Sequence, residues 1–407
     1  MKTKTETKLT RRSEAPTSGA SKKGRIGMIV ALAIAVALLC ASPAGATDVT
    51  IAWQETGVAV GNGYLPRVAS DGPGVQFTGG NLVSIYQTGT GFDAFDYASG
   101  YYDFFWNPPA SLDGEIGHAP SIAMVQGNVY EDDHNEPEDF ALEVHQGGQN
   151  NGSALWYRAG IAVNLFSSSS VTWQSAHQYD DGYNPTVAVD QYCFSCTGTA
   201  TDVVEVHQGG VNQSQLWYHT GTLVIDSATP TVTWSPSYKF DPGFEAYAPT
   251  VSIANGLVLL VGQGSAGELW YSLGVLQSDG QITWGTPKKY DNGYNPTVSL
   301  IGCKGCGSEN NGFEANWDLV EAHQALNNTT GALWYRTGRL NAGTGSTFPT
   351  AITWTPNAAT QYATEGCYPS LTQFGGLGST YAVVETNSTA CDEAADIVSS
   401  MGELQLK

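Results

Sequence analysis

The chain has 407 residues, with 17 Lys and Arg against 38 Asp and Glu and a formal net charge of −21. This excess of negative charge repels phosphate backbones, so the composition excludes nucleic acid as a partner. The length allows one large repeat domain or two to three ordinary domains.

The first 46 residues have the layout of a secretory signal. A basic stretch precedes the apolar run at residues 26–41, and small residues follow at 44–46. The run is short for a membrane span of about 20 residues, although an uncleaved anchor is the alternative. We therefore predict a signal peptide at 1–46 and a single domain at 47–407. That domain is secreted, periplasmic or on the cell surface, and has no membrane contact after cleavage.

A Leu-Trp-Tyr segment recurs around Trp156, Trp217, Trp270 and Trp334, with spacings of 61, 53 and 64 residues. A repeat of this size indicates a stacked or radial array. In the clearest unit, strand-like runs rich in Val, Thr, Tyr and Trp occupy residues 185–189, 203–207, 216–221 and 231–234. Four short antiparallel strands per unit are typical of a β-propeller blade.

Landmark residues give the number of units. The fourth strand carries Trp106, Trp173, Trp234, Trp284 and Trp354, and the first strand carries Pro66, Pro120, Pro185, Pro249, Pro296 and Pro369. The missing fourth strand lies at residues 49–53, which resemble 171–173. We therefore predict an all-β, six-bladed β-propeller with four antiparallel strands per blade, whose last blade is closed by the N-terminal strand. Five or seven blades are the alternatives.

Beyond the signal lie an even number of cysteines, which in an exported protein indicates disulfides. They are Cys193, Cys196, Cys303, Cys306, Cys367 and Cys391. The two Cys-x-x-Cys pairs suit zinc only if four ligands converge. Because they lie in repeats that are not neighbours, we expect local disulfides instead.

Polar residues recur at the end of the second strand, in the third strand and in the link to the next unit. Propeller topology brings these positions to one rim, where aromatic and planar polar side chains suit a sugar. The residues expected to bind ligand are His145, Gln146, Trp156, Arg158, Asp180, Tyr183, His207, Gln208, Trp217, His219, Asp241, Trp270, Asp291, Tyr294, His323, Gln324, Trp334 and Arg336. Repetition favours binding, because several equivalent weak sites give avidity.

The same residues also have purely structural interpretations. The Asp and Gly residues of the links suit turns, and the Trp residues suit packing. Glu and His in Glu-x-His lie on the same side of a strand, and a Glu–His pair is a more common arrangement than a metal site. The acidic run at 131–139 reads as a solvated loop, with calcium binding as the alternative.

Over residues 48–407 the order of strand–Gln, turn, aromatic strand, Trp and Gly-rich link resembles the secreted six-bladed fucose-binding lectins. The resemblance implies sugar binding between blades through Arg, an acidic residue and aromatics. Arg158 and Arg336 match the Arg position, whereas His219 and Ser272 depart from it.

Residues 278–284 also resemble the Asp-box of sialidase-type propellers, one residue short. Such an activity implies a cluster of arginines for the substrate carboxylate. Only Arg67, Arg158, Arg336 and Arg339 follow the signal, which disfavours a sialidase.

The sequence therefore predicts an exported, non-catalytic, lectin-like propeller whose partners are glycans or glycoconjugates. It predicts no cofactor, with calcium left open. A glycoside hydrolase of sialidase-like propeller type is the alternative. It needs paired carboxylates, for which Glu143, Glu205 and Glu321 are candidates by type. A protein-binding scaffold is the second alternative.

Overall fold

The structure is a computed structural model. It describes residues 49–71, 81–101, 105–130, 137–147, 152–162, 171–191, 200–210, 214–225, 229–301, 318–326, 331–342, 349–375 and 381–406. All regular elements in these ranges are β-strands, as predicted. None of the described segments forms a helix with the length and apolar character to cross a bilayer. The N-terminal segment Met1–Thr47 is a unit separate from Asp48–Lys407, and the predicted signal peptide lies outside the described residues.

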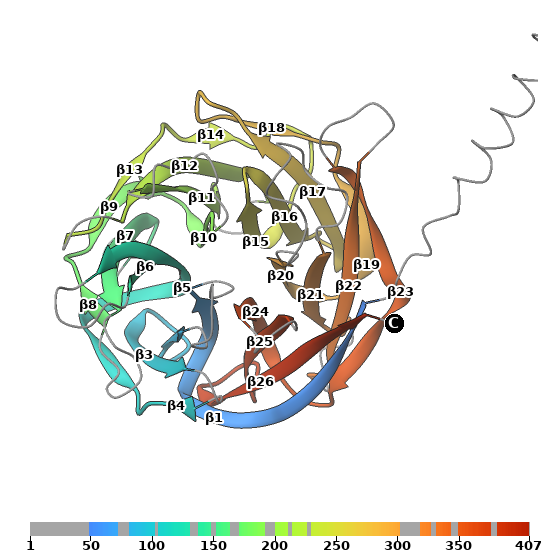
Figure 1. The fold of residues 1–407 in the computed structure, drawn as a ribbon, viewed down its shortest axis with the longest axis horizontal. Helices are drawn as coiled ribbons and strands as arrows, with labels where there is room; N and C mark the ends of the chain where they lie inside the picture. Colours follow the sequence, from blue (N-terminus) through green and yellow to red (C-terminus); the bar gives the residue numbers. More distant parts are fainter. Residues whose placement is uncertain are drawn as a thin grey trace, which may run out of the picture. The chain divides into compact units, whose positions relative to one another are not determined.

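The strands of Asp48–Lys407 form antiparallel groups in chain order (Figure 1). The first part of the chain forms β1 (Val49–Ser70), β2 (Leu82–Gln87), β3 (Asp93–Tyr101), β4 (Phe105–Trp106), β5 (Ala110–Tyr130), β6 (Pro137–Gln146), β7 (Ala154–Ala162), β8 (Val171–Trp173) and β9 (His177–Asp181). The middle forms β10 (Tyr183–Val189), β11 (Ala200–Gln208), β12 (Leu216–Val224), β13 (Thr231–Trp234), β14 (Tyr238–Lys239), β15 (Tyr247–Ala254), β16 (Leu257–Gln263), β17 (Glu268–Leu276), β18 (Ile282–Trp284) and β19 (Lys288–Asn292). The last part forms β20 (Tyr294–Ile301), β21 (Asp318–Gln324), β22 (Leu333–Ala342), β23 (Pro349–Ala363), β24 (Cys367–Gly375), β25 (Tyr381–Ser388) and β26 (Ala395–Leu406).

Three groups are separate sheets, namely β10–β14, β15–β19 and β20–β23. The remaining strands form one path, β24-β25-β26-β1-β2-β3-β5-β6-β7-β8, with β4 and β9 beside it. This path is continuous because β1 and β5 are long, and each pairs with one neighbour through its first half and with another through its second half. The predicted pairing of the N-terminal strand with the end of the chain is confirmed, since β1 pairs antiparallel with β26.

The hydrophobic core lies between neighbouring groups of strands. Each buried apolar cluster takes residues from two successive groups, as in the packing of Val144 and Ile161 with Val187 and Val203. The first strands of successive groups also contact one another, and β24 contacts both β20 and β1. Burying one such aliphatic side chain contributes about 1.5–3 kcal/mol, so contacts between the sheets hold the domain together.

The recurring glycine of the third strand and the recurring tryptophan of the fourth strand face each other. The pairs are Gly100–Trp106, Gly160–Trp173, Gly221–Trp234, Gly274–Trp284, Gly338–Trp354 and Gly402–Trp53. A Cβ on Gly274 would lie 2.6 Å from the Trp284 ring. The indole therefore requires glycine opposite it, which explains why the sequence repeats the two residues together.

A backbone kink precedes each repeated proline. The residues with positive φ at these places are Leu65, Ala119, Asn184, Ala248, Asn295 and Tyr368. A glutamine at the end of a neighbouring second strand satisfies the backbone N–H in several of them. Gln87 accepts a hydrogen bond from Ala119 (2.8 Å), and Gln263 accepts one from Asn295 (3.1 Å). The recurring Gln side chains at the ends of the second strands thus join one sheet to the next.

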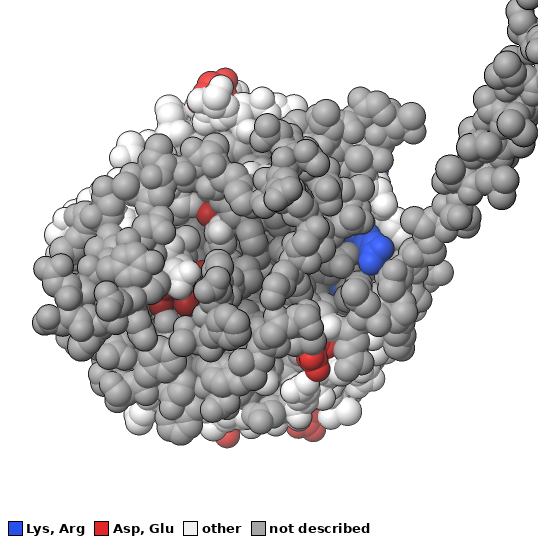
Figure 2. Space-filling view, viewed as in Figure 1, with Lys and Arg blue, Asp and Glu red and all other residues white. Residues whose placement is uncertain are grey.

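A disulfide joins Cys367 to Cys391 and confirms one predicted disulfide. Cys193, Cys196, Cys303 and Cys306 lie outside the described residues. Among the residues coloured in Figure 2, Asp and Glu lie at several separate places, whereas Lys and Arg gather mainly in one small patch. This distribution matches the acidic composition of the chain.

Candidate functional site

Most of the predicted ligand-binding residues are buried rather than displayed on a rim. The buried ones are His145, Gln146, Arg158, His207, Gln208, His219, His323, Gln324 and Arg336. Trp156, Asp180, Tyr183, Trp217, Trp270, Asp291, Tyr294 and Trp334 are half-buried, and Asp241 is exposed. A buried side chain offers a sugar little surface, so these residues mainly connect strands and sheets. Their assignment to ligand binding stays a prediction.

The Glu–His pairs are internal, as the structural interpretation predicted. His145 Nδ1 lies 2.9 Å from Glu143, His207 Nδ1 lies 3.0 Å from Glu205, and His323 Nδ1 lies 3.1 Å from Glu321. All three glutamates are fully buried, in different sheets. They therefore do not form the paired carboxylates of one hydrolase site.

The third strand places a basic side chain opposite each of these glutamates. Glu143 faces Arg158, Glu205 faces His219 and Glu321 faces Arg336 across the strand pairs. Arg336 also reaches the preceding link, with Nε 2.9 Å from Asp291 on β19. Burial lowers the pKa of Arg158 to about 10. The charged residues of the repeat thus neutralise one another inside the sheets.

A pocket of about 430 Å³ lies beside residues of the predicted rim. Gln146 and Tyr183 line it together with Phe92 and His118, two residues that the sequence did not single out. Burial lowers the pKa of His118, which the Gly91 carbonyl partly opposes. Trp156 packs instead on its own hairpin, where a Cβ on Gly147 would lie 2.3 Å from the indole nitrogen.

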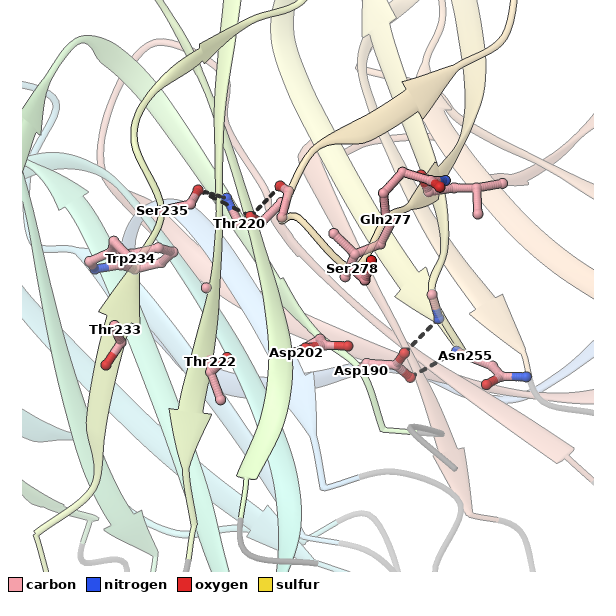
Figure 3. Close-up of a pocket in the computed structure, with 15 residues that line it drawn as sticks. Asp190, Asp202, Thr220, Thr222, Thr233, Trp234, Ser235, Asn255, Gln277 and Ser278 are labelled. Atoms are coloured by element: carbon pink, nitrogen blue, oxygen red, sulfur yellow. Dashed lines mark hydrogen bonds between the residues drawn. The ribbon is translucent and has the colours of Figure 1, made fainter. Parts of the chain in front are cut away.

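A larger groove of about 590 Å³ lies between the β10–β14 and β15–β19 sheets (Figure 3). Its walls are Thr residues of β12 and β13 with the adjoining Ser235 on one side and the turn at residues 277–280 on the other. This turn belongs to the segment that resembles an Asp-box, and the backbone N–H of Gln281 donates to Asp279 there (3.0 Å). Its size is that of a typical small-ligand site.

Two carboxyl groups, Asp190 and Asp202, lie together in this groove (Figure 3). Val189 pairs with Val203, and the Asp190 N–H donates to the Asp202 carbonyl (2.8 Å), so the register sets the two aspartates opposite each other. Opposed residues of an antiparallel pair point to the same face, with Cβ atoms about 5 Å apart. The groove therefore contains a pair of carboxyl groups on adjacent strands.

The two aspartates have different surroundings. Asp190 is buried and accepts hydrogen bonds from the backbone N–H groups of Asn255 and Gly256, both 2.8 Å. Such charge-assisted bonds stabilise a carboxylate. Burial raises the pKa of the half-buried Asp202. A carboxyl group held by two backbone N–H groups beside one whose pKa is raised is the kind of arrangement that acid–base chemistry uses.

The sequence did not reveal this pair. Residues at matching positions in every repeat drew attention to the opposite face, and Asp190 and Asp202 do not belong to the repeated polar signatures. The available signal was an aspartate at the end of the strand at 185–189 and another at the start of the strand leading to 203–207. Their opposition depends on register, which only the structure shows.

No protein-family model matches this chain, and no curated protein matches its sequence. Solved structures that it resembles include a sialidase from Trypanosoma rangeli at 9% identity and a TM-score of 0.49, covering 87% of this chain and 58% of that one. An α-L-arabinofuranosidase from Fusarium graminearum is similar at 11% identity and a TM-score of 0.48, and the match covers 86% of this chain and 98% of that one. A neuraminidase-like protein of subtype N11 from a flat-faced bat influenza virus is similar at 9% identity and a TM-score of 0.44. The match covers 88% of this chain and 93% of that one. These are likenesses of fold. The chain spans less than two thirds of the sialidase's length.

The prediction of a non-catalytic, lectin-like protein is wrong. The solved structures that resemble the chain bear the names of sialidases, neuraminidase-like proteins and an arabinofuranosidase, and none of these three is named a fucose lectin. The physical reason lies in burial, because the repeated polar residues that suggested multiple sugar sites are bonded inside the sheets. The weaker likeness to sialidase-type propellers is the one supported at the level of fold.

Proposed function

We propose that this chain is a glycoside hydrolase that binds a neutral glycan in the groove of Figure 3. The observation that carries the proposal is the opposed pair Asp190 and Asp202 in a groove of about 590 Å³. Glycoside hydrolysis commonly uses two carboxyl groups that flank the scissile bond. Thr, Ser, Asn and Gln side chains around them supply hydrogen-bond partners for hydroxyls.

The charge of the groove selects the substrate class. Its lining residues include two aspartates and neither Lys nor Arg. An anionic sugar would meet repulsion there without a guanidinium to bind its carboxylate. The described arginines lie apart, on β1, β7 and β22. A neutral hexose or pentose therefore fits the groove better than sialic acid does.

The two carboxyl groups take different roles. Asp202 is the general acid, since burial raises its pKa and favours the protonated form that donates to the leaving oxygen. Asp190 is the carboxylate that stabilises positive charge on the sugar or activates water, fixed by the two N–H groups of the β15–β16 turn. General acid catalysis contributes about 10²–10⁴-fold in rate.

The test is a screen of the purified protein against neutral aryl glycosides and plant and microbial polysaccharides. We expect turnover of at least one neutral glycoside, reduced about 10²-fold or more by Asp202→Asn. Asp241→Asn is the matched control, because this exposed carboxylate lines a different groove. Unfolding midpoints show that the variants are folded. Turnover that Asp202→Asn leaves unchanged, or no turnover of any neutral glycan, contradicts the proposal.

We also propose that residues 47–407 form a six-bladed propeller closed by β1, and that the protein is exported. The antiparallel β1–β26 pair and the contact of β24 with β1 support closure. The kink before each of the repeated prolines supports the number of blades. The Cys367–Cys391 disulfide supports an oxidising compartment.

A further inference from the structure

Three potential metal ligands converge where the link strand β9 meets the next sheet. Asp180 on β9 points at His207 on β11 and His219 on β12. Asp180 Oδ2 lies 2.8 Å from His219 Nε2 and 3.7 Å from His207 Nε2, and all three ligand atoms lie within 4.8 Å of one another. Ligands of a tetrahedral zinc ion are roughly 3.3 Å apart, from bonds of about 2.0–2.1 Å. Closing the cluster around an ion thus changes each of the two Asp180–His distances by about half an ångström and the His207–His219 distance by at most about 1.5 Å.

The other nitrogen of each imidazole is already held. His207 Nδ1 lies 3.0 Å from Glu205 Oε2, and His219 Nδ1 donates to the Ser235 carbonyl at 2.9 Å. Because that carbonyl can only accept, the Nδ1 atom of His219 carries a proton and its Nε2 atom faces Asp180. Metal-binding histidines characteristically donate their second N–H to a carboxylate or a backbone carbonyl in this way. Both outer partners of a metal site are therefore present.

Burial fixes the two rings while the third ligand remains reachable. His207 is 1% exposed and His219 is 4% exposed. The Asp180 side chain is 28% exposed, so an ion can enter from its side and keep a water ligand there. Rigid imidazoles beside an accessible carboxylate favour a site that binds an ion without rearranging the core.

The interface between the β15–β19 and β20–β23 sheets, the sister interface, has an arginine at the position that corresponds to His219. Asp291, His323 and Arg336 occupy the corresponding places on β19, β21 and β22, with Arg336 paired to Glu321 as His219 is to Glu205. There the guanidinium lies 2.9 Å from Asp291 and donates to the Tyr290 carbonyl at 2.8 Å. Where the sister interface has a permanent cation, the Asp180 interface has a second imidazole. Among the described residues, this is the interface at which two imidazoles and a carboxylate meet.

We propose that Asp180, His207 and His219 bind a divalent transition-metal ion, with Zn²⁺ as the best fit. Two imidazole nitrogens and one carboxylate oxygen suit zinc better than calcium or magnesium, which prefer oxygen ligands. The ion bridges the link of one sheet to the body of the next and takes the position that Arg336 fills at the sister interface. His219 and Thr220 alternate to opposite faces of β12, so the ion lies across the sheet from the groove lined by Thr220.

The experiment measures zinc in the full chain after treatment with a chelator and re-addition of Zn²⁺. Plasma mass spectrometry counts ions per chain, and titration calorimetry gives the affinity. We expect His219→Arg, which copies the sister interface and so preserves the fold, to bind one zinc ion fewer than wild type. His207→Ala weakens binding at the same site by at least about 100-fold. His323→Ala is the matched control and keeps the wild-type zinc content.

Comparing variants with wild type separates this site from any other metal site in the chain, including the cysteine pairs. An unchanged zinc content in His219→Arg overturns the proposal, as does a wild-type chain that binds no zinc at tens of micromolar. The readout does not involve turnover, so its outcome is independent of the proposed hydrolase activity.

Discussion

Replacing Glu385 by Gln should stabilise the protein at neutral pH. Glu385 is fully buried on β25 and matches Glu143, Glu205 and Glu321 of the other repeats. Its cross-strand partner, however, is Ser400 instead of Arg or His. Burial raises the pKa of Glu385 well above its ordinary value, and the Tyr362 hydroxyl offsets this only partly.

The sign and size of the effect follow from proton linkage. Because the folded carboxyl keeps its proton at pH values where the unfolded one has lost it, the native state binds more protons. Stability therefore falls as pH rises above the unfolded pKa, by about 1.4 kcal/mol per pH unit until the folded group ionises. Between pH 5 and pH 7 this contributes up to about 3 kcal/mol. Gln does not titrate and avoids this loss.

Denaturant unfolding followed by tryptophan fluorescence at pH 5, 6 and 7 measures the difference. We expect Glu385→Gln to exceed wild type most at pH 7, with the gap narrowing towards pH 5. The control is Glu321→Gln, which should lose about 1.5–3 kcal/mol because Glu321 accepts from Tyr290 (2.9 Å) and lies 3.1 Å from His323. A destabilised Glu385→Gln at pH 7, or a gap independent of pH, refutes the reasoning.

Two further predictions concern packing and closure. Gly274→Ala should cost about 1–3 kcal/mol by overpacking, because its Cβ would lie 2.6 Å from Trp284, whereas Gly91→Ala, with its nearest contact at 3.7 Å, should be close to neutral in thermal unfolding. Removing residues 49–63 leaves β26 paired with β25 alone and should prevent cooperative unfolding in calorimetry. Removing residues 1–46 should leave the unfolding transition intact. A cooperative transition in the first truncation contradicts closure by β1.

The repeat made the strands predictable. Period, turn residues and the Val, Thr and Trp content located β10 to β13 within a few residues, whereas the partner of β26, predicted at 49–53, extends to Gly63. The Glu–His pairs were also predictable, since alternation sets Glu205 and His207 on one side of β11. The hydrogen bonds that these side chains make between sheets could not be predicted from the sequence, because partners such as Asp180 and His219 are 39 positions apart.

The functional prediction failed for a physical reason. Repeated polar residues were interpreted as repeated binding sites, but the basic residues Arg158, His219 and Arg336 recur opposite the buried glutamates Glu143, Glu205 and Glu321. The kinks before the prolines recur because one sheet must join the next, and Asn184 and Asn295 tolerate positive φ there. Asp190 and Asp202 lie outside the polar positions that were interpreted as sugar sites, although Asp202 recurs as Asp318 and Asp190 as Asp71.

The position of a bound oligosaccharide tests the central claim most directly. Crystals of Asp202→Asn soaked with a neutral glycan that the wild-type protein hydrolyses should show the sugar in the groove between Thr222 and the turn at residues 277–280. Its glycosidic oxygen should lie within hydrogen-bond reach of position 202. Density for the sugar elsewhere, such as the pocket at His118, with an empty groove would contradict the account.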